Sequence, residues 1–304
     1  MRSDRNSKTR SLKRKLGKNP LVFHTYQFVF RALLNPMNKG NRLQSSRNYL
    51  KWYLVTKPKG KTVDITLFNG MKSTVHPDSD SGVSHIFDNG FDYLETAFIR
   101  KILEQGDLMV DAGCNVGNRT IALADMLGGG ILIDANPNCL LRAEENLRLN
   151  NLSLKNFQFI HSAVGKSNAV VEFPLDAGTS CQNSIGNTAT KSEMVQVPMV
   201  TLDSMIEELG NPEIAFLKTD LEGYDLEALR GAPRLLKSKS LKLVVFERWP
   251  NTDLDEFIRL FGDMGWDVFA LDDRGEPSSQ RNLLETRNNL IALPRTNHQL
   301  GENI

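Results

Sequence analysis

Cysteine is scarce in this chain, and no apolar run is long enough to cross a membrane. The three cysteines among 304 residues, Cys114, Cys139 and Cys181, are an odd number without metal-ligand spacing. They fit a reducing compartment better than a disulfide framework, so we expect a cytoplasmic protein. The apolar stretch at 21–34 is too short to span a bilayer and contains Arg31. We interpret it as an amphipathic helix that packs on the protein, with peripheral contact to an anionic membrane surface as the alternative.

Acidic residues are almost missing from the first sixty positions. Residues 1–60 contain fifteen Lys and Arg but Asp4 as their one acid, a charge of +14 that the rest of the chain offsets with −13. We expect a basic, partly disordered N-terminal extension over 1–60, followed by an acidic globular domain over 61–298. Because no aromatic residues interleave with the charges of residues 1–19, we expect no nucleic-acid partner.

The remainder alternates short apolar runs with amphipathic segments. Residues 61–76 predict a β-hairpin around Asn69-Gly70. Strands are predicted at 108–112, 131–134, 157–164, 215–220, 241–247, 266–271 and 289–293, and helices at 92–104, 118–127, 138–150, 224–236 and 253–264. We interpret Gly128-Gly129-Gly130 as a break in the chain, and 165–200 as a hairpin with a long loop at Gly178–Ser192. The pattern predicts an α/β protein with a doubly wound, mostly parallel, seven-stranded sheet.

A glycine-containing turn follows the first strand of this sheet. It reads Asp111-Ala112-Gly113-Cys114-Asn115-Val116-Gly117 and leads into a helix, whose first N–H groups are free. Dinucleotide-binding enzymes carry G-x-G-x-x-G at this place, but Asn115 and Asn118 replace its second and third glycines. The acid Asp111 suits a cationic ligand better than a pyrophosphate. Asp134, 23 residues further on at the end of the second strand, is placed to accept the hydroxyls of a ribose.

A charged cluster ends the fourth strand, in Leu217-Lys218-Thr219-Asp220-Leu221-Glu222-Gly223. Alternate residues of a strand share a face, so Lys218, Asp220 and Glu222 are predicted to converge at the carboxyl edge of the sheet. Three ionisable groups on an apolar strand are costly unless they are paired or functional. We take these three as candidate catalytic residues. Glu247, at the end of the fifth strand, adds the alternative of an oxygen-ligand Mg²⁺ or Ca²⁺ site, although we expect no metal.

These motifs together resemble the FkbM-type family of class I methyltransferases. The resemblance covers about Tyr93 to Glu247 and includes VDAGCNVGNRTIALA, ANPNCLLRAEENLRLNNL, SAVG, VTLDSMI and KTDLEGYDLEALRGA. Cys114 stands where the family commonly has Ala, and Ile133-Asp134-Ala135 stands where it has Phe-Glu-Pro. Asp134 keeps the carboxylate with a shorter reach, so ribose contact is expected to survive.

The resemblance implies S-adenosylmethionine as the cofactor and methylation of a hydroxyl on a sugar, glycan or small metabolite. It implies that Asp111, Gly113, Asn115, Gly117 and Asp134 line the cofactor site, with Ser162 and Ala163 near the adenine. For a hydroxyl acceptor we take Asp220 as the candidate base. Two alternatives stay open: a nicotinamide-dependent oxidoreductase, and a non-catalytic protein that binds through the basic N-terminus. The oligomeric state is not readable from the sequence.

Overall fold

The protein is described by a computed structural model for Thr25 and for residues 28–29, 42–67, 69–79, 93–175, 193–249 and 252–295. Most of the helix expected at 21–34, the tail at 1–19 and the loop expected at Gly178–Ser192 lie outside these residues. The expected domain boundary at residue 60 stays a prediction.

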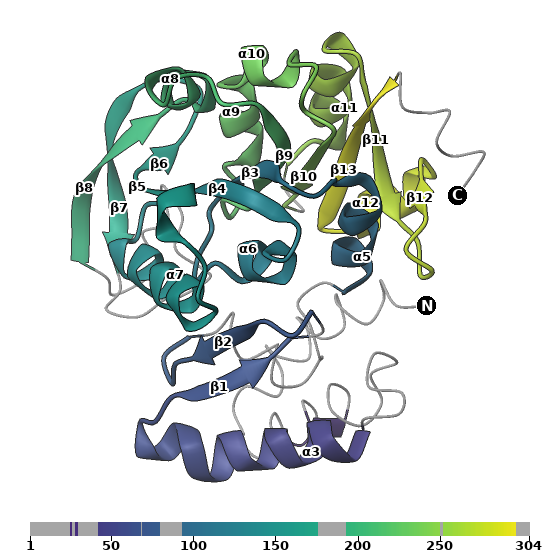
Figure 1. Ribbon diagram of the computed structural model, residues 1–304. Helices are drawn as coiled ribbons and strands as arrows, with labels where there is room; N and C mark the ends of the chain where they lie inside the picture. Colours follow the sequence, from purple (N-terminus) through teal and green to yellow (C-terminus); the bar gives the residue numbers. More distant parts are fainter. Residues whose placement is uncertain are drawn as a thin grey trace.

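A mostly parallel eight-stranded sheet runs through the centre of the molecule (Figure 1). Its strands, in spatial order, are β12 (Pro277–Ser278), β11 (Trp266–Leu271), β13 (Asn289–Pro294), β10 (Leu243–Glu247), β9 (Ile214–Thr219), β3 (Asp107–Ala112), β4 (Leu127–Asp134) and β5 (Phe157–His161). The five strands from β10 to β5 are parallel, whereas β11, β12 and β13 pair antiparallel. All seven predicted strands are present in this sheet, and β12 adds a two-residue strand at its edge.

Successive side chains of the central strands are buried on opposite faces, which explains why the sheet sits between two layers of helices. Val110 and Ala112 of β3 pack with α8 (Leu202–Glu208), α9 (Asp225–Arg230), α10 (Pro233–Leu236) and α11 (Leu254–Asp263). Met109, between them in the chain, packs on the opposite face with α5 (Tyr93–Ile102) and α6 (Asn118–Leu123). Leu132 of β4 shares that opposite face with α6 and α7 (Pro137–Leu149). Strands buried on both sides are typical of a doubly wound sheet, as the sequence predicted.

The glycine run was interpreted wrongly as a chain break, because all three glycines belong to β4. A side chain at Gly129 would collide with the carbonyl oxygen of Asn156, so the strand needs glycine to pass its neighbour closely. Two further expected elements are divided. The strand expected at 157–164 leaves the main sheet after His161, and the helix expected at 224–236 is interrupted between α9 and α10.

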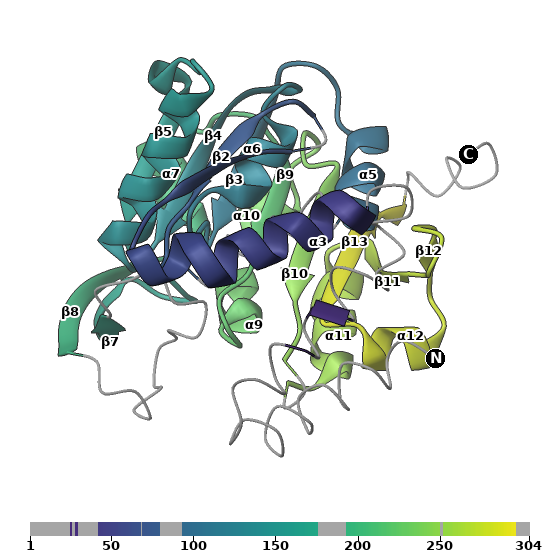
Figure 2. The same cartoon turned by 90° about the horizontal axis from the view of Figure 1, so that it is seen from below.

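A small sheet and an N-terminal layer flank the core. The strands β6 (Ala163–Val164), β8 (Glu193–Val200) and β7 (Ala169–Leu175) form a three-stranded sheet, which contains the predicted 165–200 hairpin. The hairpin of β1 (Val63–Thr66) and β2 (Lys72–Val75) is also present, and α7 holds it through Asn146 and Asn150. Helix α3 (Arg42–Lys51) continues as a π-helical turn to Thr56 and packs on this hairpin from outside (Figures 1 and 2).

Candidate active site

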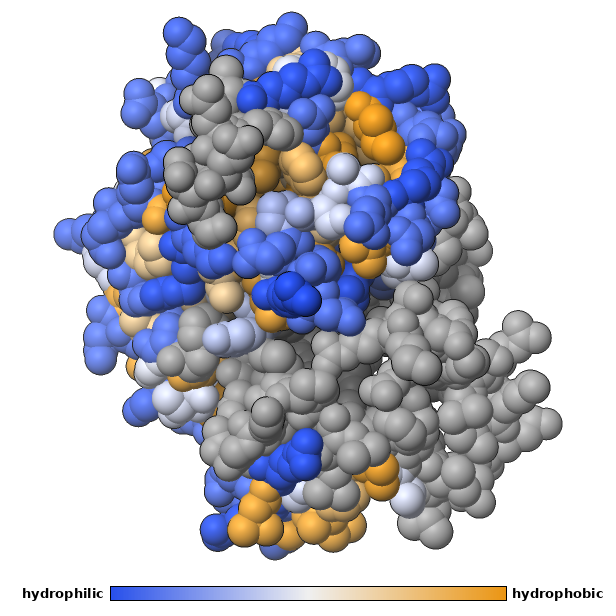
Figure 3. Space-filling model, turned by 90° about the vertical axis from the view of Figure 1, so that its right-hand side faces the viewer, coloured by the Kyte–Doolittle hydropathy of each residue, from blue (hydrophilic) through white to orange (hydrophobic). Residues whose placement is uncertain are grey.

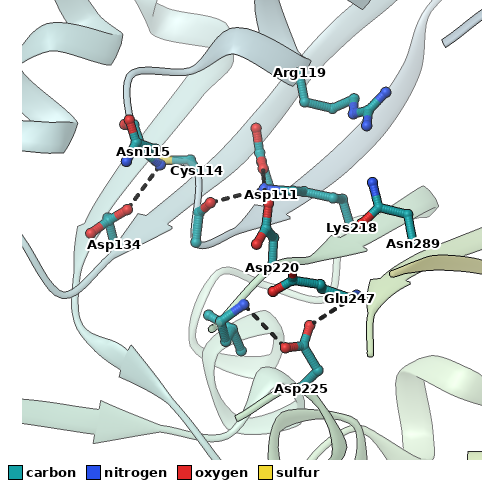
Figure 4. Close-up of polar contacts among 12 residues, drawn as sticks. Asp111, Cys114, Asn115, Arg119, Asp134, Lys218, Asp220, Asp225, Glu247 and Asn289 are labelled. Atoms are coloured by element: carbon teal, nitrogen blue, oxygen red, sulfur yellow. Dashed lines mark hydrogen bonds and ion pairs between the residues drawn. The ribbon is translucent and has the colours of Figure 1, made fainter. Parts of the chain in front are cut away.

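The carboxyl ends of the parallel strands meet at one edge of the sheet, and the predicted polar residues gather there (Figure 4). Asp111 lies on β3, Asp134 on β4, Lys218 on β9 and Glu247 on β10. The N-terminal end of the antiparallel β13 brings Asn289 to the same edge, opposite Glu247. This is the edge at which open α/β sheets bind ligands.

The turn after β3 is shaped by backbone conformation. Gly113, Asn115 and Gly117 all have positive φ angles, of 74°, 50° and 76°. A side chain at Gly113 would collide with the carbonyl oxygen of Asp220, so this glycine brings the turn against the end of β9. The close approach that the glycine permits is therefore one between two segments of the protein.

Asp134 forms the second part of this turn. Its Oδ2 accepts a hydrogen bond of 2.8 Å from the backbone N–H of Asn115, and its Oδ1 accepts one of 2.8 Å from Asn136. Burial outweighs these two donors and raises the pKa of Asp134 to about 6. The half-buried carboxylate is thus fixed in place and retains lone pairs for a further donor.

A buried ion pair connects the two halves of the edge. Lys218 Nζ donates to the carbonyl oxygen of Gly113 at 2.9 Å and lies 3.2 Å from Asp111 Oδ1 and 3.5 Å from Asp220 Oδ2. Burial by itself would lower the pKa of Lys218, but Asp111 and Asp220 reverse this and raise it. Thr120 donates to the other oxygen of Asp111 at 2.8 Å. Lys218 is therefore a fixed ammonium that holds the β3 turn against the end of β9.

Carboxyl groups crowd the other half of the edge. Asp220, Glu222 and Glu247 each offer an oxygen, and these oxygens lie within 4.8 Å of one another. Burial, with Glu247 and Asp220 nearby, raises the pKa of Glu222 to about 8. Burial and the neighbouring carboxylates of Asp220 and Asp225 likewise raise the pKa of Glu247 to about 8. The cluster therefore retains protons near neutral pH unless a cation joins it.

Sequence reasoning missed Asp225, which organises this cluster from below. Its two oxygens accept from the backbone N–H groups of Leu221 at 3.2 Å and Glu247 at 3.3 Å, so it ties the turn after β9 to the end of β10. Burial and the nearby Asp220 raise its pKa to about 7. The turn holds Glu222 at a φ of 53°, which is strained for a glutamate. The third acid of the motif DLEGYD was the sequence signal for Asp225.

Ser162 and Ala163 lie beside Asp134, where β5 gives way to β6. The backbone N–H of Ser162 donates to the carbonyl oxygen of Asp134 at 3.1 Å, and its hydroxyl donates to Pro198 at 2.9 Å. Both residues are buried. The hydrogen bonds of Ser162 connect the ends of β4 and β5 with β8. The Ser162 hydroxyl is therefore already used within the protein. His161 is exposed, with Nε2 3.0 Å from the carbonyl oxygen of Ala135.

A second buried ion pair supports the edge from the α5 side. Arg119 pairs with Glu95 and donates to Thr96 at 2.9 Å, while Asn289 donates to the other oxygen of Glu95 at 2.9 Å. Arg119 is thus buried, and its guanidinium is engaged by the side chains of α5. Helical periodicity did not reveal Glu95, because its partner is 24 positions away in the chain.

Trp249 follows β10 and covers the acidic cluster. Its indole N–H donates to Glu247 Oε2 at 2.8 Å, and its ring lies over Gly223, while 37% of the residue stays exposed. An aromatic face next to carboxylates is suited to contact a hydroxylated ligand, because the ring packs on apolar C–H surface and the carboxylates accept hydrogen bonds.

The chain resembles one protein-family model and several solved structures. A model of the methyltransferase FkbM domain matches residues 111–266. A search of curated proteins gave no match. The crystal structure of methyltransferase FkbM from Methylobacillus flagellatus KT is 13% identical, with a TM-score of 0.43 over 71% of this chain and 55% of its own length. The S-adenosylmethionine-dependent methyltransferase from Agrobacterium tumefaciens is 12% identical, with a TM-score of 0.41 over 78% of this chain and 71% of its own.

The matched segment spans half of the chain and contains both halves of the carboxyl edge, from Asp111 to Glu247. The nicotinamide-dependent alternative loses its basis, because its glycine fingerprint is broken at Asn115 and the matched family is a different one. The chain belongs to the FkbM family of S-adenosylmethionine-dependent methyltransferases.

Proposed function

We propose that this methyltransferase transfers a methyl group to a hydroxyl of a sugar, glycan or small metabolite. The observation that carries the proposal is the acidic cluster of Asp220, Glu222 and Glu247, in which two carboxyls have pKa values of about 8 beside the cofactor turn. A hydroxyl has to lose its proton to become a methyl acceptor, and a base with a pKa near the working pH serves this step best.

The residues of the β3–β4 half fit an adenosyl sulfonium. Asp134 offers a fixed carboxylate with free lone pairs to the ribose hydroxyls, and the turn from Asp111 to Gly117 surrounds it. The broken glycine fingerprint and the excess of carboxyl groups disfavour a pyrophosphate. We assign contact with the cofactor to Asn115, Asp134, Ser162 and Ala163, and we propose that Asp111, Gly113 and Gly117 hold the turn of the cofactor site in shape. When bound, S-adenosylmethionine supplies an activated methyl group for in-line displacement.

The residues of the β9–β10 half are proposed to orient the acceptor and to remove its proton. Asp220, beside the Lys218 ammonium, is suited to accept a hydrogen bond from the acceptor and orient it. Burial and neighbouring carboxylates raise the pKa of Glu222 and of Glu247 to about 8, so we assign proton removal to this pair and orientation to Asp220. The assignment moves the base from Asp220, where the sequence motif placed it, to Glu222 and Glu247.

The first test is calorimetric titration of the full chain with S-adenosylhomocysteine, NADH and a single-stranded oligonucleotide. We expect binding of the first and none of the other two. Methyl-labelled S-adenosylmethionine is then incubated with a panel of sugars, nucleotide sugars and small hydroxylated metabolites. Label on a hydroxyl oxygen supports the proposal, whereas label on nitrogen or on RNA contradicts the acceptor class. Absence of S-adenosylhomocysteine binding would contradict the cofactor site.

A divalent cation at the same three carboxylates is the rival arrangement. The proposal requires a carboxylate of the cluster that is free to accept a proton and is not bound to a metal, so we expect labelling to continue in the presence of a chelator. Loss of labelling with the chelator, followed by recovery with Mg²⁺, would replace the proton-acceptor role of Glu222 and Glu247 with metal ligation.

A further inference from the structure

Among the residues that the structure describes, the outer face of α3 and of the turn that follows it carries exposed apolar side chains. Leu43, Leu50 and Leu54 are spaced seven and four positions apart, so they share one side of the helix. Their exposed fractions are 86%, 45% and 71%. The opposite side of the helix is buried, because Tyr49 and Trp52 pack on the β1–β2 hairpin. The leucines therefore lie on the exposed side of this helix, away from the hairpin. Figure 2 shows α3 on the outside of the molecule.

Positive charge surrounds this stripe of leucines. Six exposed basic residues flank it, and the sequence from 42 to 63 contains no acid: Arg42, Arg47, Lys51, Lys57, Lys59 and Lys61. Figure 3 shows the result at the lower end of the molecule, where hydrophobic surface lies directly beside hydrophilic surface. An apolar stripe bordered by Lys and Arg is the arrangement of a helix that lies in the interface of a membrane.

We propose that this leucine stripe, with its basic border, is a docking surface for an anionic lipid bilayer. Charge complementarity selects this occupant. A second copy of the chain would bring two strongly basic surfaces together, which like-charge repulsion opposes. A nucleic acid would satisfy the charges, but it would leave three leucines without an apolar partner. A bilayer with anionic headgroups satisfies both features at once.

The contact is peripheral and independent of the proposed methyl acceptor. No helix among the described parts of the chain is long and apolar enough to cross a membrane. Leucine insertion and headgroup attraction are two separate contributions, and stable peripheral binding needs both. The leucines and basic residues of this surface come from α3 and the segment that follows it, and none of the carboxyls of the sheet edge belongs to it.

The test uses the full-length protein and sedimentation with lipid vesicles. One set contains phosphatidylcholine, and the other also contains about a third phosphatidylglycerol. We expect sedimentation with the anionic vesicles and little with the neutral ones, and binding weakens as salt rises. The double variant Leu50→Gln/Leu54→Gln is expected to bind at least about tenfold more weakly, because it loses two inserted side chains. Arg47→Glu/Lys51→Glu is expected to weaken binding by a similar factor or more.

Matched controls carry the same changes elsewhere. Leu141→Gln alters another exposed leucine, on α7, and Lys237→Glu/Lys239→Glu reverses two exposed charges after α10. Neither control should change vesicle binding. Because all substituted side chains are exposed, every variant should keep its melting temperature. The fluorescence emission of the Leu54→Trp variant should shift to the blue with anionic vesicles, whereas that of the Leu141→Trp variant should not.

Three outcomes would overturn the proposal. The first is equal vesicle binding by the wild type and both α3 variants, which would place any attraction elsewhere. The second is a wild-type dimer that Leu50→Gln/Leu54→Gln dissociates, which would make the stripe an interface between copies. The third is oligonucleotide binding that Arg47→Glu/Lys51→Glu abolishes, without vesicle binding by the wild type.

Discussion

The two halves of the carboxyl edge carry similar acids with different partners. At the β3–β4 half, Asp111 and Asp134 have partners on both oxygens, from Thr120, Lys218 and two backbone N–H groups. At the β9–β10 half, Glu222 and Glu247 face other carboxyls, and the pKa of each is raised to about 8. Fixed groups suit the cofactor binding that we propose for the first half. Carboxyls with pKa values near neutral pH suit the proton transfer that we propose for the second.

The largest effect is expected where the two halves meet, at Lys218. Lys218→Met removes the ammonium between Asp111 and Asp220 and leaves Asp111 charged and fully buried. Breaking a buried pair from one side typically costs about 3–5 kcal/mol, so urea unfolding should show a loss of that order. Lys237→Met, at an exposed lysine, is the control and should change the free energy of unfolding by less than about 0.5 kcal/mol. Equal stabilities for the two variants would mean that the halves are not joined through Lys218.

The next effect separates binding from chemistry. Asp134→Asn removes the carboxylate that we propose as the acceptor for the ribose hydroxyls, so the Kd for S-adenosylhomocysteine should rise by about 10- to 100-fold, or roughly 1.5–3 kcal/mol. Glu222→Gln, in the other half, should change this Kd by less than about threefold, because the demethylated product carries no sulfonium charge. Calorimetric titration measures both variants. A larger loss with Glu222→Gln would reverse the roles given to the halves.

The third effect is the pH dependence of stability. The pKa values of Glu222 and Glu247 are about 8 in the folded protein, against an ordinary value of 4.5, so the folded state binds more protons between these limits. The free energy of unfolding should therefore fall as the pH rises from about 5 to about 8, by about 1–2 kcal/mol after allowance for solvent screening. Acids with lowered pKa values, such as Asp78 and Asp125, lose their stabilising contribution below this window.

The double variant Glu222→Gln/Glu247→Gln should flatten this pH dependence, and Glu208→Gln, at an exposed glutamate, should not. Chemical denaturation across the pH range distinguishes the two. A wild-type stability that rises from pH 5 to pH 8 as steeply as that of the double variant would show that the cluster is not destabilised by ionisation.

Local patterns in the sequence predicted the frame of this edge. Period-two alternation placed Lys218 with Asp220, and the strand ends placed Asp111 and Asp134 beside them, because parallel strands align their carboxyl ends. The run Gly128–Gly130 defeated the same reasoning. These glycines form a strand because Gly129 passes close to the backbone of Asn156. Asn156 belongs to another segment, so the local sequence pattern does not reveal this contact.

The groups that tune the edge were harder to predict. Asp225 and Glu95 look like ordinary first-turn acids of amphipathic helices, since that position is favoured by the helix dipole. Their partners come from other elements: Glu247 for Asp225, and Arg119 and Asn289 for Glu95. The strained φ of Glu222 also depends on how the turn docks between β9 and β10. Pairings over long sequence distances are thus what the sequence withholds.

The smallest expected effect compares the two non-glycine residues that hold positive φ angles in these turns. Asn115, at 50°, belongs to a residue type that tolerates this conformation, and its side chain accepts from Val116 N–H at 2.8 Å. Glu222 has a φ of 53°, a conformation that glutamate rarely adopts. Glu222→Gly should therefore raise the free energy of unfolding by about 0.5–1 kcal/mol, while removing a proton acceptor from the cluster. Asn115→Gly should leave it unchanged or lower it, because it loses that hydrogen bond without relieving comparable strain. Thermal unfolding at pH 8 measures both. If Asn115→Gly were the more stabilising of the two, the larger backbone strain would lie at Asn115 in the β3–β4 half of the edge. The positive φ of Glu222 would then not be a strained conformation that a functional role has to account for.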